Sequence, residues 1–90
     1  MSDPIQIPIN GVLDLHTFHP GDLPDLLDDY LGACIEHHIF TVRIIHGKGT
    51  GTLKKRVHSL LKRHRRVKSF SDAPPDAGGW GATVVELIGP

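Results

Sequence analysis

The feature that most constrains the fold of this chain is a glycine-rich segment, residues 46–51, with the sequence His-Gly-Lys-Gly-Thr-Gly. It directly follows an apolar run, residues 40–45, and precedes a helical pattern that begins at Leu53. Glycines at alternate positions leave one side of a loop without Cβ atoms, so backbone N–H groups can close on an anion while Lys48 adds a positive charge. Because phosphates bind where a strand's carboxyl end meets a helix's amino end, we predict that this loop is an anion-binding site.

Two common nucleotide-binding motifs do not fit this loop. A Walker A loop requires glycine five residues before the Gly-Lys pair, where this chain has Val42. A dinucleotide-binding fingerprint requires a third glycine at the position of Thr52. Nucleotide-cofactor binding is therefore excluded, and the remaining alternative to an anion site is a glycine-rich turn that only joins a strand to a helix.

Charged residues are strongly separated along the chain. Residues 1–36 contain seven Asp or Glu and no Lys or Arg, whereas all ten Lys and Arg lie within residues 43–68, which contain no acidic residue. The basic segment favours an anionic partner such as nucleic acid. The helix positions expected to contact phosphates are Lys54, Lys55, Lys62 and Arg63. The alternative is that an acidic first helix lies beside the basic second helix and neutralises it.

Hydrophobic periodicity predicts four strands and two helices. The strands are expected at residues 12–16, 39–45, 67–71 and 82–88, the helices at about residues 23–37 and from residue 52 onward, and a loop at residues 72–79. Asp22 with Asp25 is expected to cap the first helix, and Thr52 the second. The order β-α-β-α-β-β predicts an α/β fold of the α+β two-layer sandwich type, in which two helices cover one face of a mixed four-stranded sheet.

The chain length limits the number of domains, because ninety residues cannot form two hydrophobic cores. We expect residues 1–11 to form an extended N-terminal arm, since Pro4 and Pro8 exclude a helix there, and residues 12–90 to form the domain. No signal peptide and no apolar run of membrane-spanning length are present, so we expect a cytoplasmic monomer without membrane association. The single cysteine, Cys34, falls on the apolar face of the first helix and is expected to pack in the core.

His16 and His46 are the candidate catalytic histidines. Each ends a predicted strand, and a right-handed β-α-β crossover makes those strands parallel, so both imidazoles are expected to emerge at the same edge of the sheet. One could take a proton from the 2′-hydroxyl of RNA while the other protonates the leaving oxygen, with Lys48 and the loop N–H groups stabilising the charged transition state. Asp14, on the same face as His16, is a candidate to orient an imidazole.

Metal-assisted hydrolysis is the alternative chemistry, in which Asp14, His16 and His46 hold a metal ion that activates water. No Cys pair and no His-Glu-x-x-His spacing accompanies them, so no metal or other cofactor is predicted. The remaining histidines are expected to be solvated or to lie at helix ends: His19, His37, His38, His58 and His64. Trp80, between two glycines, is either a platform on which a base stacks or a side chain folded over its own hairpin.

Three segments resemble the Smr (small MutS-related) domain family: residues 13–16 (Leu-Asp-Leu-His), residues 46–51 and residues 79–85. The resemblance extends over residues 12–88, and it departs from the family at Thr17, where the family usually has glycine. It implies a fold similar to the C-terminal domain of a bacterial translation initiation factor. It also implies nucleic-acid binding and, as in several members, endonuclease activity that nicks DNA or cuts RNA. The positions that correspond to the family's functional residues are Asp14, His16, His46, Gly47, Lys48 and Gly49, with Gly79 and Gly81 in support.

Together, the residues and the resemblance predict an endonuclease that cleaves or nicks phosphodiester bonds of RNA or DNA. The predicted catalytic residues are Asp14, His16, His46 and Lys48. The predicted nucleic-acid-binding residues are Gly47, Gly49, Gly51, Lys54, Lys55, Lys62, Arg63, Gly79, Trp80 and Gly81. Two alternatives remain open: a catalytically silent module that binds nucleic acid or ribosomes, and a protein-interaction domain that uses the charge separation.

Overall fold

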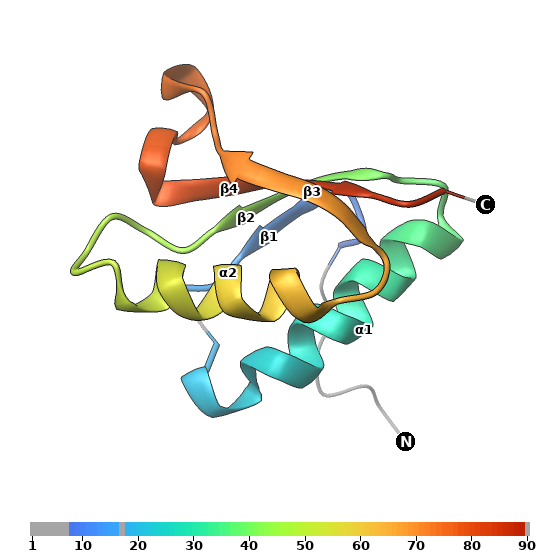
Figure 1. Cartoon of the computed structure of the whole chain (residues 1–90), viewed down its shortest axis with the longest axis horizontal. Helices are drawn as coiled ribbons and strands as arrows, with labels where there is room; N and C mark the ends of the chain where they lie inside the picture. Colours follow the sequence, from blue (N-terminus) through green and yellow to red (C-terminus); the bar gives the residue numbers. More distant parts are fainter. Residues whose placement is uncertain (1–7, 17, 90) are drawn as a thin grey trace.

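Two helices cover one face of a four-stranded sheet (Figure 1). The computed structural model describes residues 8–16 and 18–89. The strands are β1 (Val12–Asp14), β2 (Thr41–Ile45), β3 (Val67–Asp72) and β4 (Ala82–Leu87), and the helices are α1 (Leu23–Glu36) and α2 (Thr52–Arg63). Short 3₁₀ turns lie at Pro20–Asp22, Pro75–Ala77 and Gly79–Gly81. The predicted order β-α-β-α-β-β and the predicted fold class are confirmed.

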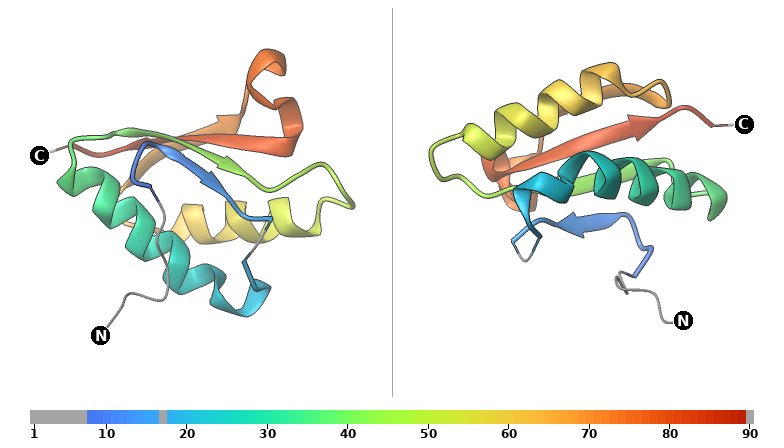
Figure 2. Two further views of the ribbon diagram at one scale, coloured as in Figure 1. Left: turned by 180° about the vertical axis from the view of Figure 1, so that it is seen from behind. Right: turned by 90° about the horizontal axis from the view of Figure 1, so that it is seen from below.

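The strand order in the sheet, β1-β2-β4-β3, brings three chain segments to one edge. β1 and β2 are parallel, so their carboxyl ends lie together, and β4 is antiparallel to β2, so it begins where they end. Ile45, the last residue of β2, is accordingly paired both with Asp14 at the end of β1 and with Ala82 at the start of β4. Figure 2 shows the same two layers from behind and from below.

The hydrophobic core lies between the sheet and the helices. In β2, Val42 and Ile44 are fully buried while the intervening Arg43 is partly exposed, because side chains alternate between the two faces of a strand. The largest fully buried side chains are Leu13, Leu27, Leu31, Ile44, Leu61, Val42, Val57, Val85, Thr83 and Cys34. Full burial of a Leu, Ile or Val side chain contributes about 1.5–3 kcal/mol, so this layer is the main stabilising element. Thr83 is a polar residue within it.

The helix caps differ from the sequence predictions. Asp22 precedes α1 but makes no capping hydrogen bond, because it ends a 3₁₀ turn with helical angles (φ −91°, ψ −2°) instead of the extended backbone that a capping side chain requires. The residue before α2 is Gly51, with φ +84°, and Thr52 is the first helical residue. Both predicted caps are therefore wrong, although the helices begin where they were expected.

The strand ends also differ by one or two residues from the predicted bounds. β1 ends at Asp14 and not at residue 16, although the Leu15 N–H still bonds to the Ile45 carbonyl at 3.0 Å. β2 begins at Thr41, two residues later than predicted. Residues 1–7, most of the predicted N-terminal arm, lie outside the described residues, as does Thr17.

Candidate functional site

The three segments that resemble one family meet at the edge where β1 and β2 end. The Gly81 carbonyl accepts hydrogen bonds from the backbone N–H groups of His46 at 3.1 Å and Gly47 at 2.8 Å. A Cβ at Gly81 would lie 3.0 Å from Cγ of Lys48, so Gly81 and the loop are packed closely together. On the other side of the loop, His16 Nε2 lies 3.9 Å from the position that a Cβ of Gly47 would occupy.

The register of β1 and β2 places His16 beside Gly47 and not beside His46. His46 follows the buried Ile44 by two residues, so it lies on the helix-covered face and is only 7% exposed. His16 follows the exposed Asp14 by two residues, and its side chain is 66% exposed. Both histidines therefore follow strands that end at this edge, as expected, but the His46 imidazole is buried and the His16 imidazole is exposed.

Asp14 holds the His16 ring in one orientation. Its Oδ1 accepts the backbone N–H of His16 at 3.0 Å and lies 2.6 Å from His16 Nδ1. Both hydrogen bonds lower the pKa of the Asp14 carboxyl group. The bond from the backbone N–H has the larger effect and the bond from the ring the smaller. A charged carboxylate accepts hydrogen bonds only, so it favours the tautomer in which Nδ1 carries the proton. The Nε2 of His16, which faces Gly47, is then free to accept a proton.

His46 is bonded inside the protein through both ring nitrogens. Nδ1 donates to the carbonyl of Gly47 at 3.0 Å, and Nε2 lies 2.8 Å from Thr83 Oγ1, which is fully buried. Burial is the main cause of a lowered pKa for His46, because the charged imidazolium loses its hydration. The ring therefore fixes the loop from within and leaves no nitrogen for a substrate.

His58 is a residue whose position the sequence prediction missed. It was expected to be solvated or helix-terminal, yet it is partly buried in the middle of α2, and its Nε2 lies 2.8 Å from the same Thr83 Oγ1. The His58 ring also packs edge-on against Phe70, with ring centroids 4.8 Å apart. Its position in the sequence, one residue after the buried Val57 and three before the buried Leu61, was the available sign that it flanks the inner face of the helix.

The glycine loop, residues 46–51, has two halves that differ in their backbone hydrogen bonds. The N–H groups of His46 and Gly47 face Gly81 and are already bonded. Among the described residues, no backbone or side-chain acceptor is recorded for the N–H groups of the other half, residues 48–51. These groups precede α2, whose amino end carries a partial positive charge. Only the N–H groups of residues 48–51 are therefore available for the anion that the sequence predicts.

Trp80 lies between two lysines at the same edge. The Lys48 and Lys54 ammonium groups are 5.8 and 5.9 Å from the centre of its ring, within cation–π range. Trp80 remains 49% exposed. Lys54 also forms an ion pair with Asp72 at 2.8 Å, which holds it beside the ring.

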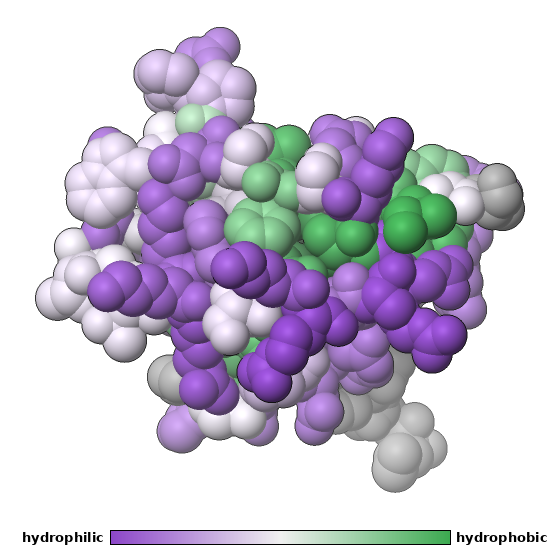
Figure 3. Space-filling view, in the orientation of Figure 1, coloured by the Kyte–Doolittle hydropathy of each residue, from purple (hydrophilic) through white to green (hydrophobic). Residues whose placement is uncertain are grey.

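A basic groove of about 570 Å³ continues from this edge along α2 and β3. It is lined by Gly51, Lys54, Lys55, His58, Ser59, Lys62 and Phe70. Figure 3 shows hydrophilic side chains gathered over α2 on this side of the molecule. Three predicted nucleic-acid-binding lysines therefore line one groove, whereas Arg63, also exposed, does not line it.

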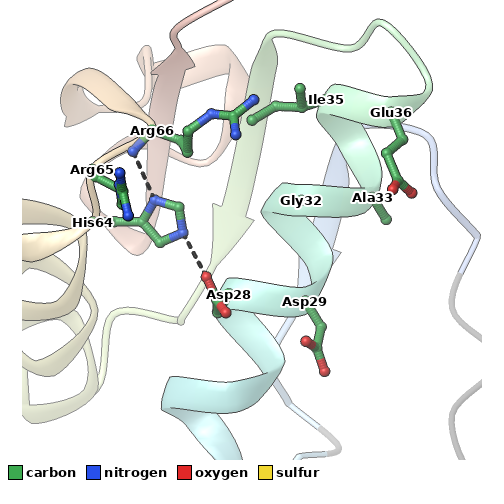
Figure 4. Close-up of a pocket in the computed structure, with 9 residues that line it drawn as sticks. All are labelled: Asp28, Asp29, Gly32, Ala33, Ile35, Glu36, His64, Arg65 and Arg66. Carbon is green, nitrogen blue, oxygen red and sulfur yellow. Dashed lines mark hydrogen bonds and ion pairs between the residues drawn. The ribbon is translucent and has the colours of Figure 1, made fainter.

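A second hollow of about 570 Å³ lies between α1 and the connection from α2 to β3 (Figure 4). His64 spans it: Nδ1 accepts the backbone N–H of Arg66 at 3.1 Å, so Nε2 donates to Asp28 at 3.0 Å. In residues 8–16 and 18–89, no Lys or Arg of α2 forms an ion pair with an acidic residue of α1. Direct pairing of the two helices therefore does not neutralise the lysines of the groove.

Within residues 8–16 and 18–89, no three His, Cys, Asp or Glu side chains are grouped so that they could hold a metal ion. Neither of the helices in that part of the chain is long and apolar enough to cross a membrane.

Comparison with known proteins identifies related sequences and structures. Endonuclease MutS2 of Thermomicrobium roseum is 43% identical over 75 residues, which is 83% of this chain but only 10% of that protein. Endonuclease MutS2 of Staphylococcus carnosus is 44% identical over 75 residues, again 10% of its length. This chain therefore spans about a tenth of these relatives.

Two solved structures are also similar to this chain. The Smr domain of Thermus thermophilus MutS2 matches with a TM-score of 0.79 and 38% identity, over 87% of this chain and 98% of that one. YdaL, a stand-alone small MutS-related protein from Escherichia coli, matches with a TM-score of 0.79 over 87% of this chain and 64% of that one; at 24% identity it shows the fold alone. A model of the Smr domain matches residues 13–88, and the chain belongs to the Smr domain family.

Proposed function

We propose that this domain is an endonuclease that cleaves phosphodiester bonds of RNA or DNA. The observation that carries the proposal is an exposed imidazole, His16, whose tautomer is set by Asp14 and whose Nε2 lies beside Gly47 of the glycine loop. The similarity to proteins named Endonuclease MutS2 supports the same reaction class. Because this chain covers about a tenth of those proteins, activity of the domain by itself is part of the proposal.

His16 acts as the general base. With Nδ1–H bonded to Asp14, Nε2 accepts the proton of the attacking group, which is the 2′-hydroxyl in RNA or water in DNA. As the new bond to phosphorus forms, the bond to the leaving oxygen breaks, and that oxygen takes a proton from Lys48 or from water. The Asp14 carboxylate stabilises the imidazolium that His16 becomes.

Lys48 and the N–H groups of residues 48–51 stabilise the negative charge that builds up on the phosphoryl oxygens in the transition state. His46 has a different role in this proposal, because its ring is buried and both nitrogens are bonded internally. It holds the Gly47 carbonyl and thereby the shape of the loop. Of the four predicted catalytic residues, His16 and Lys48 act at the substrate, and Asp14 acts through the His16 ring.

The basic groove and Trp80 bind the substrate strand. Lys55 and Lys62 are exposed and form no ion pair with any residue described in the structure, so their charges are available for phosphates. Trp80 offers a π-face that stacks with any base, since stacking does not depend on sequence. Substrate recognition is therefore expected to depend on backbone charge and unpaired bases.

Cleavage assays test this proposal directly. The purified domain is incubated with structured RNA, supercoiled plasmid and single strands, with and without a chelator, and compared with a His16→Ala protein. His37→Ala is the matched control, because His37 is an exposed histidine that follows the carboxyl end of α1. Cleavage of at least one substrate that is lost in His16→Ala and kept in His37→Ala is expected. Equal cleavage by the His16→Ala protein would refute the proposed base.

A catalytically silent binding module is the second candidate function. The observation that favours it is the groove itself, because lysine–phosphate contacts and stacking on Trp80 need no titrating group. Binding of all these nucleic acids without cleavage of any of them would select this alternative.

A further inference from the structure

The fully buried Thr83 hydroxyl joins two histidines that are far apart in the sequence. Its Oγ1 lies 2.8 Å from His46 Nε2 and 2.8 Å from His58 Nε2. His46 follows β2, His58 belongs to α2 and Thr83 belongs to β4, so the three side chains connect three elements beneath the glycine loop. No part of the proposed mechanism uses His58.

Gly47, His46, Thr83 and His58 form a chain of three hydrogen bonds, and the chemistry of the partners fixes the direction of each one. A carbonyl only accepts, so the bond to Gly47 requires a proton on His46 Nδ1. In a neutral ring the Nε2 of His46 then has no proton and must accept the Thr83 hydroxyl hydrogen. Because that hydrogen is used, the bond between Thr83 and His58 requires a proton on His58 Nε2. The chain therefore runs from His58 through Thr83 to His46.

Both rings are held in their neutral forms near neutral pH. Burial is the first cause of a lowered pKa for His46 and for His58, and the positive charge of Lys54 lowers both further. Asp72 acts in the opposite direction on both, and a charge on His46 further lowers the pKa of His58. For His46 the hydrogen bond to Gly47 also raises the pKa, and burial outweighs both this bond and the opposing charge of Asp72.

We propose that His58 is a positioning residue for the glycine loop: by donating to Thr83 it directs the Thr83 hydroxyl hydrogen to His46 and reinforces the His46 tautomer that the bond to Gly47 requires, which holds Gly47 beside His16. If the His58 donor is absent, the Thr83 hydroxyl loses one of its two partners and is free to rotate away from His46. A rotated Thr83 hydroxyl can accept from His46 Nε2, so a tautomer protonated at Nε2 competes with the one that donates to Gly47. The effect on cleavage rests on the proposed function, whereas the hydrogen-bond chain does not.

Ring ¹⁵N NMR spectra of the histidines test the chain without any substrate. Near neutral pH, His46 should be protonated at Nδ1 and His58 at Nε2. The His58→Leu protein should show a mixture of His46 tautomers, and His58→Gln, which keeps an N–H donor, should restore a single one. His37→Leu is the control and should leave the His46 signals unchanged. A His46 protonated at Nε2 in the unaltered protein, or unchanged in His58→Leu, would overturn the proposal.

A second pair of variants covers the case in which His58→Leu does not fold. Thr83→Val keeps the shape of the side chain but removes the hydroxyl, and Thr83→Ser keeps the hydroxyl. The Val protein should show mixed His46 tautomers and the Ser protein a single one; identical spectra for the two would overturn the chain.

Cleavage supplies the functional readout. His58→Leu should lower kcat roughly 10-fold, the lower range seen when the hydrogen-bond partner of a functional histidine is removed, with KM unchanged and His58→Gln restoring the rate. Full kcat in a His58→Leu protein with mixed tautomers would refute the positioning role. If the unaltered protein cleaves nothing while its His46 tautomer still depends on His58, the nuclease proposal fails and the hydrogen-bond chain stands.

Discussion

His16 and His46 leave neighbouring parallel strands at the same edge of the sheet, but one ring lies at the surface and the other in the interior. The His16 side chain is 66% exposed, and His46 is 7% exposed. Two histidines that the sequence presents as an acid–base pair are thus separated by the sheet. For this reason the proposed mechanism gives proton transfer to His16 and the shape of the loop to His46.

Replacement of His16 by alanine should lower the cleavage rate by about 10² to 10⁴-fold, the usual contribution of a general acid or base. Nucleic-acid affinity should stay the same, because the groove lysines and Trp80 are untouched. Single-turnover rates together with filter-binding affinities measure the two effects. A parallel loss of affinity and rate would mean that His16 binds the substrate and does not transfer a proton.

Replacement of His46 by alanine should act first on stability. It removes a buried ring and leaves the Thr83 hydroxyl and the Gly47 carbonyl each without one partner, at a cost of about 1–3 kcal/mol per unsatisfied group. Urea unfolding of His46→Ala should therefore show a lower midpoint with an unchanged m-value. His37→Ala, which removes an exposed ring, should unfold like the unaltered protein. An unchanged midpoint for His46→Ala would contradict the buried role.

Stability should fall as the pH drops below about 6.5, the pKa of an unfolded histidine. The pKa values of His46 and His58 are lowered in the folded state, so below that pH the unfolded state binds more protons and unfolding becomes more favourable. Above about pH 6.5 both rings are neutral in the folded and in the unfolded state, so they do not make stability depend on pH. Unfolding free energies measured across this range should show a shallower slope in His58→Gln, which removes one of the two rings, than in His37→Gln.

Salt dependence should identify the lysines that contact phosphates. In Lys55→Ala, the slope of log affinity against log salt should flatten by about 0.9 on duplex DNA or about 0.7 on single strands, because one fewer counterion is released. Lys68→Ala removes the same charge from an exposed position of β3 outside the groove and should keep the full slope. Equal slopes for the two variants would show that net charge, and not the groove, attracts nucleic acid.

Trp80 should contribute more to the affinity for single strands than to the affinity for duplexes. Stacking of one base on an aromatic ring is worth about 1–3 kcal/mol, so Trp80→Ala should weaken single-strand binding roughly 5- to 150-fold, while Trp80→Phe keeps most of the affinity. Fluorescence anisotropy with single-stranded and duplex oligonucleotides measures both. Equal losses on the two forms would indicate that the ring serves only to hold Lys48 and Lys54.

The architecture and the meeting of the three segments could be predicted from patterns in the sequence. Periodicity placed both helices, since apolar residues at steps of three and four need a single buried face, as Leu27 and Leu31 of α1 show. The β-α-β order made β1 and β2 parallel, and that alone brings Asp14 and the glycine loop to one edge. These features depend on contacts between residues close in the chain or on connection rules, both of which a sequence contains.

Which side chains face a substrate was decided by the tertiary structure. Val42, Ile44 and His46 alternate along one strand, and this pattern indicates that His46 is buried. Its hydrogen-bond partner Thr83 is known only from the tertiary structure. His58 and Thr83 are 25 residues apart, and their hydrogen bond exists because a helix and a strand pack at one particular offset. That offset is set by the fit of many buried side chains at once, and no short segment of the sequence contains it.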